Sequence, residues 1–320
     1  MKDCDDLSWY SRKADGLRAK TSDGAVAAAD DVGRRARIDA LLARLSALGI
    51  RGSVEHRTMF TRSLPPGCRG CLGGKGTNLY VTGLCTRDCF FCFNTKPRKD
   101  EIVVHGFKIK EPEEAAQIVE RYGLHSVGIS GGEPLLFPER VLRIIRSLRS
   151  LKNRVRIDLY SNGDRATDDM LARLKEEGLD AVRFNLVANE FDISPVRRAL
   201  RHFKEVAVEI PAVPDRLDDL KGMVLELDRA GAPYLNIHEL FFCRENDARV
   251  RDEGYAAQKE ASEALFWSPV ADGEEAALSL LLFALENAKT LSAYYCSCKT
   301  QEMISRRGLK RRNRLLASWS

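Results

Sequence analysis

No stretch of 18 consecutive apolar residues occurs in this sequence of 320 residues. The longest apolar run, residues 276–285, is interrupted by Ser279 and flanked by glutamates, so it predicts a buried helix and not a membrane span. The first ten residues are acidic and no apolar stretch follows them, so we expect no secretory signal peptide. With 44% hydrophobic and 30% charged residues, collagen, coiled-coil, membrane and disordered proteins are excluded.

The excess of positive charge is small and local. The formal net charge is +5, and residues 306–314 alone carry six positive charges and no acid. The basic character therefore belongs to one C-terminal stretch and not to the whole surface. Such a stretch could contact the phosphates of RNA, although no aromatic residues are interleaved with it, and a basic helix is more often simply solvated.

Cysteine is abundant, with nine residues. The number is odd, and seven of the nine fall in short clusters, while Cys4 and Cys243 stand alone. A disulfide framework in a secreted protein would look different. We therefore expect reduced thiols that bind metal, and a cytoplasmic location.

Strand and helix patterns divide the chain into three parts. Residues 1–63 lack strand signals and contain an amphipathic helix over 30–48, so they predict a helical N-terminal arm. Residues 64–76 are rich in Pro and Gly and predict a loop that opens the core domain, 64–240. Residues 241–320 predict a C-terminal extension, with a long irregular segment followed by two helices.

Short apolar strands alternate with helices through the core domain. The predicted strands are residues 78–83, 126–130, 155–161, 181–187, 206–213 and 234–240. The predicted helices between them are residues 112–122, 138–151, 167–177, 195–203 and 217–230. This order predicts an α/β fold with a parallel sheet, either an open doubly wound sheet or a partial (β/α)6 barrel. In both, chemistry belongs at the C-terminal ends of the strands.

Three cysteines follow the first predicted strand. Cys85, Cys89 and Cys92 have the spacing C-x3-C-x2-C. Three thiolates fit three irons of a [4Fe–4S] cluster and leave the fourth iron open to a small chelating molecule. The alternative is a zinc site, which would need a fourth ligand from elsewhere in the chain.

The triplet resembles the signature of the radical S-adenosylmethionine (radical SAM) superfamily. Residues 130–134, with the sequence SGGEP, follow the second strand and match its GGEP motif, and Phe91 matches its aromatic position beside the adenine. The resemblance covers residues 78–240 and favours the partial barrel. It implies a [4Fe–4S] cluster and S-adenosylmethionine as cofactors. One electron, from a donor such as ferredoxin or flavodoxin, would cleave S-adenosylmethionine to methionine and a 5′-deoxyadenosyl radical, which takes hydrogen from a substrate.

The resemblance also assigns roles to residues at the ends of the next strands. Gly131, Gly132 and Glu133 would hold the methionine amino group. Ser161 and Asn162 stand where relatives place ribose contacts, although Asn162-Gly163 also fits a plain turn. Arg183 would hold the methionine carboxylate, or else form a structural ion pair.

A closer resemblance is to an archaeal group related to the pyruvate formate-lyase activating enzyme. It rests on LYVTGLC (79–85), VEIPAVP (208–214), NIHEL (236–240) and YYCSCK (294–299), and spans residues 64–314. The sequence departs from the activating enzyme at Tyr160, where that enzyme has an aspartate near the methionine carboxylate. The group therefore need not share its activity.

The remaining clustered cysteines form two pairs, Cys68 with Cys71 and Cys296 with Cys298. Together, the two pairs predict four ligands for a structural zinc or a second [4Fe–4S] cluster, and four unrelated thiols are the alternative. A second centre below the first strand would lie on the order of 20 Å from the triplet, given the rise of an extended strand. If residues 73–76 fold back over the barrel mouth, it would lie near the substrate.

The substrate is less well marked. Glu209, Asn236 and Glu239 lie at strand ends and could orient a polar substrate, or could simply face solvent. By strand alternation, Asn236 and His238 share one face, and Glu239 lies on the other. The hypotheses are a ribosomally made peptide or protein side chain, RNA, a glycyl-radical enzyme to be activated, and a small metabolite. A non-catalytic iron–sulfur or zinc module is also possible. We expect no membrane partner.

Overall fold

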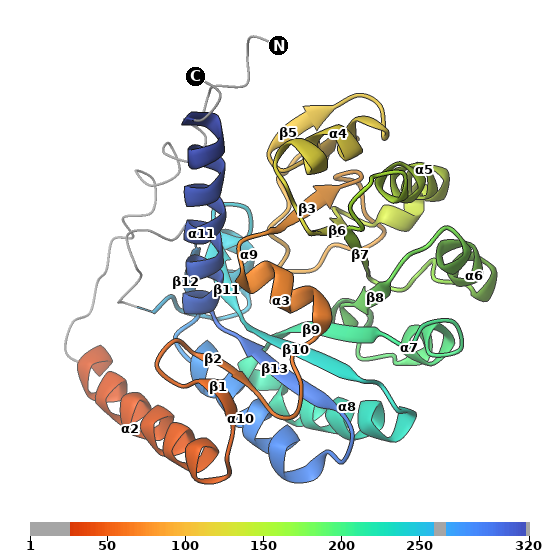
Figure 1. The fold of residues 1–320 in the computed structure, drawn as a ribbon. Coiled ribbons are helices and arrows are strands. Elements are labelled where there is room, and N and C mark those ends of the chain that lie inside the picture. Colours follow the sequence, from red (N-terminus) through yellow and green to blue (C-terminus); the bar gives the residue numbers. More distant parts are fainter. Residues whose placement is uncertain (1–25, 259–266, 318–320) are drawn as a thin grey trace.

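The computed structural model describes residues 26–258 and 267–317, which form one α/β unit around a central sheet (Figure 1). Seven strands run parallel and lie side by side in chain order. They are β3 (Gly76–Tyr80), β6 (Ser126–Ser130), β7 (Arg156–Ser161), β8 (Ala181–Phe184), β9 (Val206–Ala212), β10 (Tyr234–Glu239) and β13 (Ser292–Cys296). A doubly wound sheet reverses its strand order part-way, so this order is that of a barrel wall. The predicted partial barrel is confirmed.

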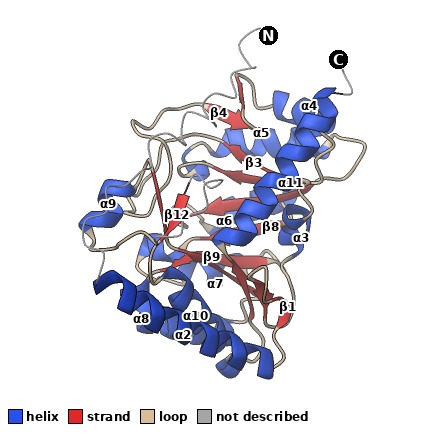
Figure 2. Ribbon diagram, turned by 90° about the vertical axis from the view of Figure 1, so that its left-hand side faces the viewer, coloured by secondary structure: helices blue, strands red, loops and turns tan. Residues whose placement is uncertain are grey.

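Helices after the strands cover one face of this wall, as Figure 1 shows. They are α4 (Glu114–Arg121), α5 (Pro138–Arg149), α6 (Asp168–Glu176), α7 (Ser194–Ala199), α8 (Leu217–Ala230) and α10 (Gly273–Asn287). Short 3₁₀ turns η2 (Pro134–Leu136), η3 (Leu186–Asn189) and η4 (Pro214–Arg216) follow β6, β8 and β9. The N-terminal helix α2 (Val26–Ala47) packs beside α10, which also contacts α8 (Figure 2). No helix within the described ranges is long and apolar enough to cross a membrane.

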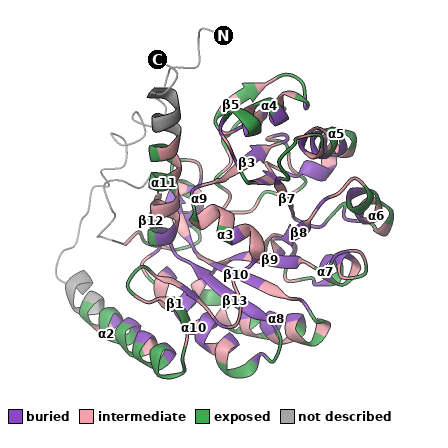
Figure 3. Ribbon diagram, in the orientation of Figure 1, coloured by how far each residue is buried: buried purple, intermediate pink, exposed green. Residues whose placement is uncertain are grey.

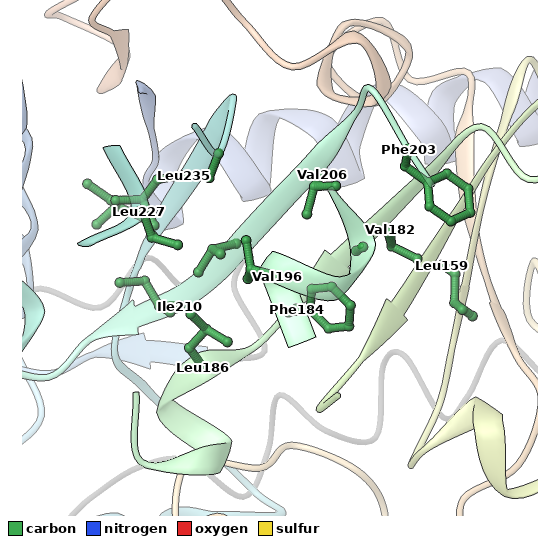
Figure 4. Packing of buried hydrophobic residues seen from close by; sticks show 14 of the residues in the cluster. Leu159, Val182, Phe184, Leu186, Val196, Phe203, Val206, Ile210, Leu227 and Leu235 are labelled. Carbon is green, nitrogen blue, oxygen red and sulfur yellow. The ribbon is translucent and has the colours of Figure 1, made fainter. Parts of the chain in front are cut away.

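The two faces of the wall differ in polarity because side chains alternate along each strand. Apolar side chains such as Leu159, Val182 and Leu235 are buried against the helices, and Figure 4 shows this packing. Asp158 and Arg183 alternate with them and point to the opposite, inner face. Burial follows the strands, and exposed residues lie on the outer sides of the helices (Figure 3). The core therefore lies outside the wall, and polar chemistry lies inside it.

Two helices lie on the inner face, α3 (Pro66–Leu72) and α11 (Cys298–Ala317). The prediction of a simple loop over residues 64–76 is wrong, because Pro66 begins a helix at a position where its missing N–H costs nothing. A Cβ at Gly67 would stand 2.2 Å from Asp158 Oδ2. Glycine therefore lets α3 lie directly against the inner side chains of the wall.

Several short elements of the structure were not predicted from the sequence. Residues 1–63 contain the hairpin β1 (Arg51–Ser53) and β2 (Thr58–Phe60), so the expectation of an arm without strands is wrong. The seventh parallel strand, β13, was also missed, and it pairs with both β10 and β2. Other missed elements are β4 (Ile102–Val104), β5 (Phe107–Ile109), β11 (Phe241–Cys243), α9 (Asp247–Asp252) and β12 (Trp267–Pro269). Most are strands of three residues, too short to show an alternating pattern.

Candidate functional site

The cysteine triplet lies in the loop that follows β3, at the C-terminal edge of the wall. Cys85, Cys89 and Cys92 are all partly exposed. The Cys85 sulfur accepts a hydrogen bond from the backbone N–H of Arg87 at 3.4 Å and a longer contact from Asn162 Nδ2 at 3.8 Å. N–H donors of this kind stabilise a thiolate.

The three thiols interact electrostatically. Burial raises the pKa of Cys89 to about 11, and Cys92 and Cys85 add to the rise. Without a cation the Cys89 thiol is therefore neutral at pH 7, and a bound metal would favour its deprotonated form. Within the described residues, no three His, Cys, Asp or Glu side chains are grouped to hold one metal ion. Three sulfur donors on one loop fit the separate irons of a cluster, which need no such convergence.

The Gly131-Gly132-Glu133 loop is bonded directly to the triplet loop. Gly132 N–H donates to Thr82 O at 2.7 Å, and Glu133 N–H donates to Leu84 O at 2.8 Å. A Cβ at Gly132 would stand 1.9 Å from Leu84 O. Only glycine allows this approach, so the motif sets the position of the backbone just before Cys85.

The Glu133 carboxylate is fully buried and joins two strand ends. It accepts hydrogen bonds from Ser161 Oγ at 2.9 Å, Asn162 N at 2.8 Å and Leu135 N at 3.0 Å. Burial raises the pKa of Glu133, and these donors oppose the rise. The carboxylate thus holds the ends of β6 and β7 together. Its predicted contact with the methionine amino group stays a proposal.

Asn162 is the link between β7 and the triplet. Besides its contact with Cys85, its Nδ2 donates to Thr86 Oγ1 at 2.8 Å. Thr86 in turn donates to Asp164 at 2.6 Å, and Arg87 forms an ion pair with the same carboxylate. The structure therefore places Asn162 beside the triplet loop and Ser161 against Glu133, and their predicted ribose contacts stay a proposal.

Phe91 is held by the C-terminal segment of the chain. Its backbone oxygen accepts from Asn246 Nδ2 at 3.0 Å, and its ring lies edge-on to Phe90 at 5.3 Å. Phe90 stacks on Tyr255. Asn246 is 1% exposed and also accepts from Cys243 N, so it joins the triplet loop to β11.

Arg183 lies in a different part of the inner face. Its guanidinium is buried between Asp158, at 2.8 Å, and Glu209. Burial would raise the pKa of Glu209, but Arg183 and His238 lower it to about 2. The structure shows the ion pair that was the alternative to a carboxylate-binding role, and no contact of Arg183 with the triplet.

Two of the three predicted substrate residues, Glu209 and Asn236, lie near Cys68. Asn236 Nδ2 donates to Glu209 at 2.8 Å and to Cys68 Sγ at 3.3 Å. His238 contacts Glu209 at 3.2 Å, which confirms that Asn236 and His238 share a face. Glu239 points the other way and accepts from Tyr295 and from Cys298 N. Glu209 and Asn236 are thus brought together, and Glu239 is not.

The outer cysteines meet on the inner face. Cys68 of α3 packs with Tyr294 and Cys296 of β13, and α3 contacts α11, which begins at Cys298. The sequence suggested two positions for this pair, below the first strand or near the barrel mouth. The structure shows neither, because α3 lies against the inner face of the wall.

Sequence reasoning missed some residues that shape the site. Asn94 donates to Gly131 O at 2.7 Å, and Asp158 neutralises Arg183. Asp158 could have been found, because an acidic residue inside an apolar strand is costly unless it has a partner. Asn94 lies in a loop and carries no such signal.

The family model for the Radical SAM superfamily matches residues 79–210, which include the triplet, the Gly-Gly-Glu loop and Asn162. Residues 79–210 therefore form a radical SAM domain. It is an enzyme, and the superfamily binds a [4Fe–4S] cluster and S-adenosylmethionine and needs a reductant.

Several proteins are similar to this radical SAM enzyme. A putative glycyl-radical enzyme activating enzyme of Methanocaldococcus jannaschii is 28% identical over 265 residues, which are 79% of this chain and 67% of that protein. A probable GTP 3′,8-cyclase of Methanococcus aeolicus is 33% identical over 120 residues, 35% of this chain and 37% of that protein. The crystal structure of methylornithine synthase aligns with a TM-score of 0.49 at 12% identity, covering 93% of this chain and 83% of that one.

Proposed function

We propose that the enzyme holds its [4Fe–4S] cluster on Cys85, Cys89 and Cys92 and abstracts hydrogen from a peptide or protein substrate. The observation that carries the first part is the direct bonding of the Gly-Gly-Glu loop to the triplet loop, Gly132 N–H to Thr82 O. This puts the two motifs of the superfamily at one edge of the wall. A small electron carrier such as ferredoxin or flavodoxin supplies the electron.

The cluster and S-adenosylmethionine, when bound, supply one-electron cleavage of the sulfonium C–S bond, giving methionine and a carbon radical that takes a hydrogen atom from the substrate. The residues of this chain bind and orient. Gly131 and Gly132 bring backbone close to the triplet, and Glu133 fixes the two strand ends. Asn162 reaches the triplet loop from β7, and Phe91 lies on the loop itself. We assign the methionine, ribose and adenine contacts to this set.

The substrate class rests on the relative from Methanocaldococcus jannaschii. Its name describes an enzyme that activates a glycyl-radical enzyme, and its similarity covers 79% of this chain. The similarity to the GTP 3′,8-cyclase covers only 35%. A protein substrate is therefore favoured over a nucleotide, and glycyl-radical activation is the second candidate function. RNA is disfavoured because the basic stretch, residues 306–314, contains no interleaved aromatic residues.

The test of this function uses purified, anaerobically reconstituted protein with S-adenosylmethionine and dithionite. Wild type should form 5′-deoxyadenosine, and Cys89→Ala should form none. Cys243→Ala is the matched control, because Cys243 is a buried thiol outside the clusters. Retained 5′-deoxyadenosine formation by Cys89→Ala would overturn the assignment of the triplet.

The outer cysteines support a second metal centre, a [4Fe–4S] cluster or a zinc. Cys68 and Cys296 come from segments more than 200 residues apart, yet pack in one cluster on the inner face. Thiols that gather from two distant segments of the chain are better explained by a shared metal than by chance. Metal analysis of the protein should show iron beyond about four per chain, or zinc. A protein with neither extra iron nor zinc would contradict the proposal of a second centre.

A further inference from the structure

We infer that the second centre is an iron–sulfur cluster held by Cys68, Cys71 and Cys296, and that Cys298 lies outside its ligand set. The inference rests on the proposed second metal centre and narrows it. Three features of the inner face carry it: the donors aimed at Cys68, the grouping of the thiols, and the partner of Cys298.

Two N–H donors are directed at the sulfur of Cys68. Its sulfur accepts contacts from Asn236 Nδ2 at 3.3 Å and from Arg183 Nη1 at 3.7 Å. Both donors are themselves buried, Asn236 at 1% and Arg183 at 2% exposure. A neutral buried thiol packs as a small apolar group and needs no such donors. A metal-bound thiolate does, and hydrogen bonds to cluster sulfurs also set the reduction potential.

The same arrangement occurs at the triplet. There an asparagine, Asn162, directs its Nδ2 to Cys85, the first cysteine of its motif. On the inner face Asn236 directs its Nδ2 to Cys68, likewise the first cysteine of its motif. Asn236 lies on β10 and Asn162 directly follows β7, and each reaches a cysteine carried by a different segment. Two sulfur sites with like donors argue for like occupants.

Cys71 and Cys296 belong with Cys68. Cys68 packs with Cys296 and Tyr294 in one cluster of buried side chains. Cys71 lies three residues after Cys68 on α3, so the two side chains lie on the same face of that helix. These three sulfurs form one group.

Cys298 faces another partner. Its N–H donates to Glu239 Oε1 at 3.2 Å, and Glu239 also accepts from Tyr295. Tyr295 lies on the apolar side of the wall, whereas Tyr294 and Cys296 lie inside it. The hydrogen bond to Glu239 therefore ties Cys298 to the side of the wall opposite to Cys68 and Cys296.

Iron is favoured over zinc by the number of ligands. A structural zinc takes four ligands that converge on one ion. A cluster binds each cysteine at a different iron, so a set of three cysteines, Cys68, Cys71 and Cys296, suits it.

The test compares the two neighbouring cysteines of one motif. Cys296→Ala and Cys298→Ala are each made in the Cys85/Cys89/Cys92→Ala background, so that only the second centre is counted. Iron, sulfide and zinc contents are measured after anaerobic reconstitution, with the EPR spectrum of the reduced protein. We expect the background to hold about four irons, Cys298→Ala to keep them and Cys296→Ala to lose them.

The outcomes separate the inference from the proposals beneath it. Loss of iron from both variants, or retention by both, would overturn the ligand set while leaving a second centre in place. Zinc in place of iron would overturn the cluster. A background without any metal would contradict the second centre itself, yet leave the triplet's function untouched. Thermal unfolding of Cys296→Ala and of the milder Cys296→Ser shows whether the Cys296 variants still fold.

A further variant tests the donor at Cys68. Asn236→Ala should retain the iron of the second centre and shift its reduction potential to a more negative value, because one N–H donor to sulfur is lost. Asn185→Ala is the control, since Asn185 caps η3 and its side chain contacts no cysteine sulfur in the described residues. An unchanged potential in Asn236→Ala would contradict a sulfur-directed role for this residue.

Discussion

At the residue scale, buried polar side chains of the site form hydrogen bonds mainly to other groups of the protein and so fix its backbone. Glu133 is the main example, because all its hydrogen bonds are to groups of this chain, from Ser161, Asn162 and Leu135. The GGEP sequence identified this position as functional. That its carboxylate links the ends of two strands could not be predicted, because its donors Ser161 and Asn162 lie 28 and 29 residues further along the chain.

Glu133→Gln should destabilise the fold by about 1–3 kcal/mol, the cost of leaving a buried donor unsatisfied. The amide keeps one oxygen but turns an NH2 group toward groups that donate. Urea unfolding measures the change, and Glu226→Gln, at an exposed position of α8, is the matched control. Equal unfolding midpoints for Glu133→Gln and wild type would contradict the role of Glu133 in linking the two strand ends.

Asp228 gives the fold a dependence on pH. Burial would raise the pKa of Asp228, but backbone N–H groups of Lys289, Leu291 and Thr290 lower it well below its ordinary value. The folded pKa lies below the unfolded one, so this stabilisation is present above about pH 4 and is lost as the pH falls further.

Asp228→Asn should therefore lower the melting temperature at pH 7 and have a smaller effect at pH 2.5, where part of the stabilisation is already lost. Asp218→Asn, fully solvated on the same helix, serves as the comparison. A deficit of equal size at both pH values would show that the stabilisation does not depend on the ionised carboxylate.

At the element scale, the long periodic segments were predictable and the short ones were not. The helix predicted over 217–230 is α8, and the strand predicted over 126–130 is β6, each with the same bounds. Each carries several turns or alternations of apolar residues, so packing and local pattern agree. By contrast, α3 forms over a Pro/Gly segment because it packs on Asp158 and Arg183, a tertiary reason that no local pattern contains.

The N-terminal helix α2 is joined to α10 by apolar and ionic contacts. Leu45 is fully buried, and Arg37 and Arg44 pair with Glu275 and Glu286. Exposed ion pairs contribute little, so the apolar contact dominates.

Leu45→Ala should cost about 2–5 kcal/mol in the free energy of unfolding. Leu48→Ala, at a position 49% exposed, should change it by less than about 0.5 kcal/mol. Denaturant unfolding of both variants checks this, and comparable losses would mean that α2 is not held by burial.

At the scale of the whole molecule, both ends of the described chain complete the wall. Strand β13 lies between β10 and β2, so residues from the predicted arm and extension share a sheet with the predicted core. The order of the six predicted strands could be derived from their alternation with helices. The seventh could not, because its pairing joins segments more than 200 residues apart.

This architecture gives the two cysteine groups separate places. The triplet follows the first parallel strand, and the outer cysteines join α3 to the last. The sequence was sufficient to predict the triplet chemistry because its motif is local. The partners of the outer cysteines, Asn236 and Arg183, emerged only with the fold.

The central proposal is that the triplet holds the cluster that cleaves S-adenosylmethionine. Its most direct test is the EPR spectrum of the reduced protein, with and without S-adenosylmethionine, in wild type and in the Cys85/Cys89/Cys92→Ala variant. We predict a [4Fe–4S] signal in wild type that changes on adding S-adenosylmethionine, and no such response in the variant. A variant that keeps an S-adenosylmethionine-responsive signal would contradict the claim.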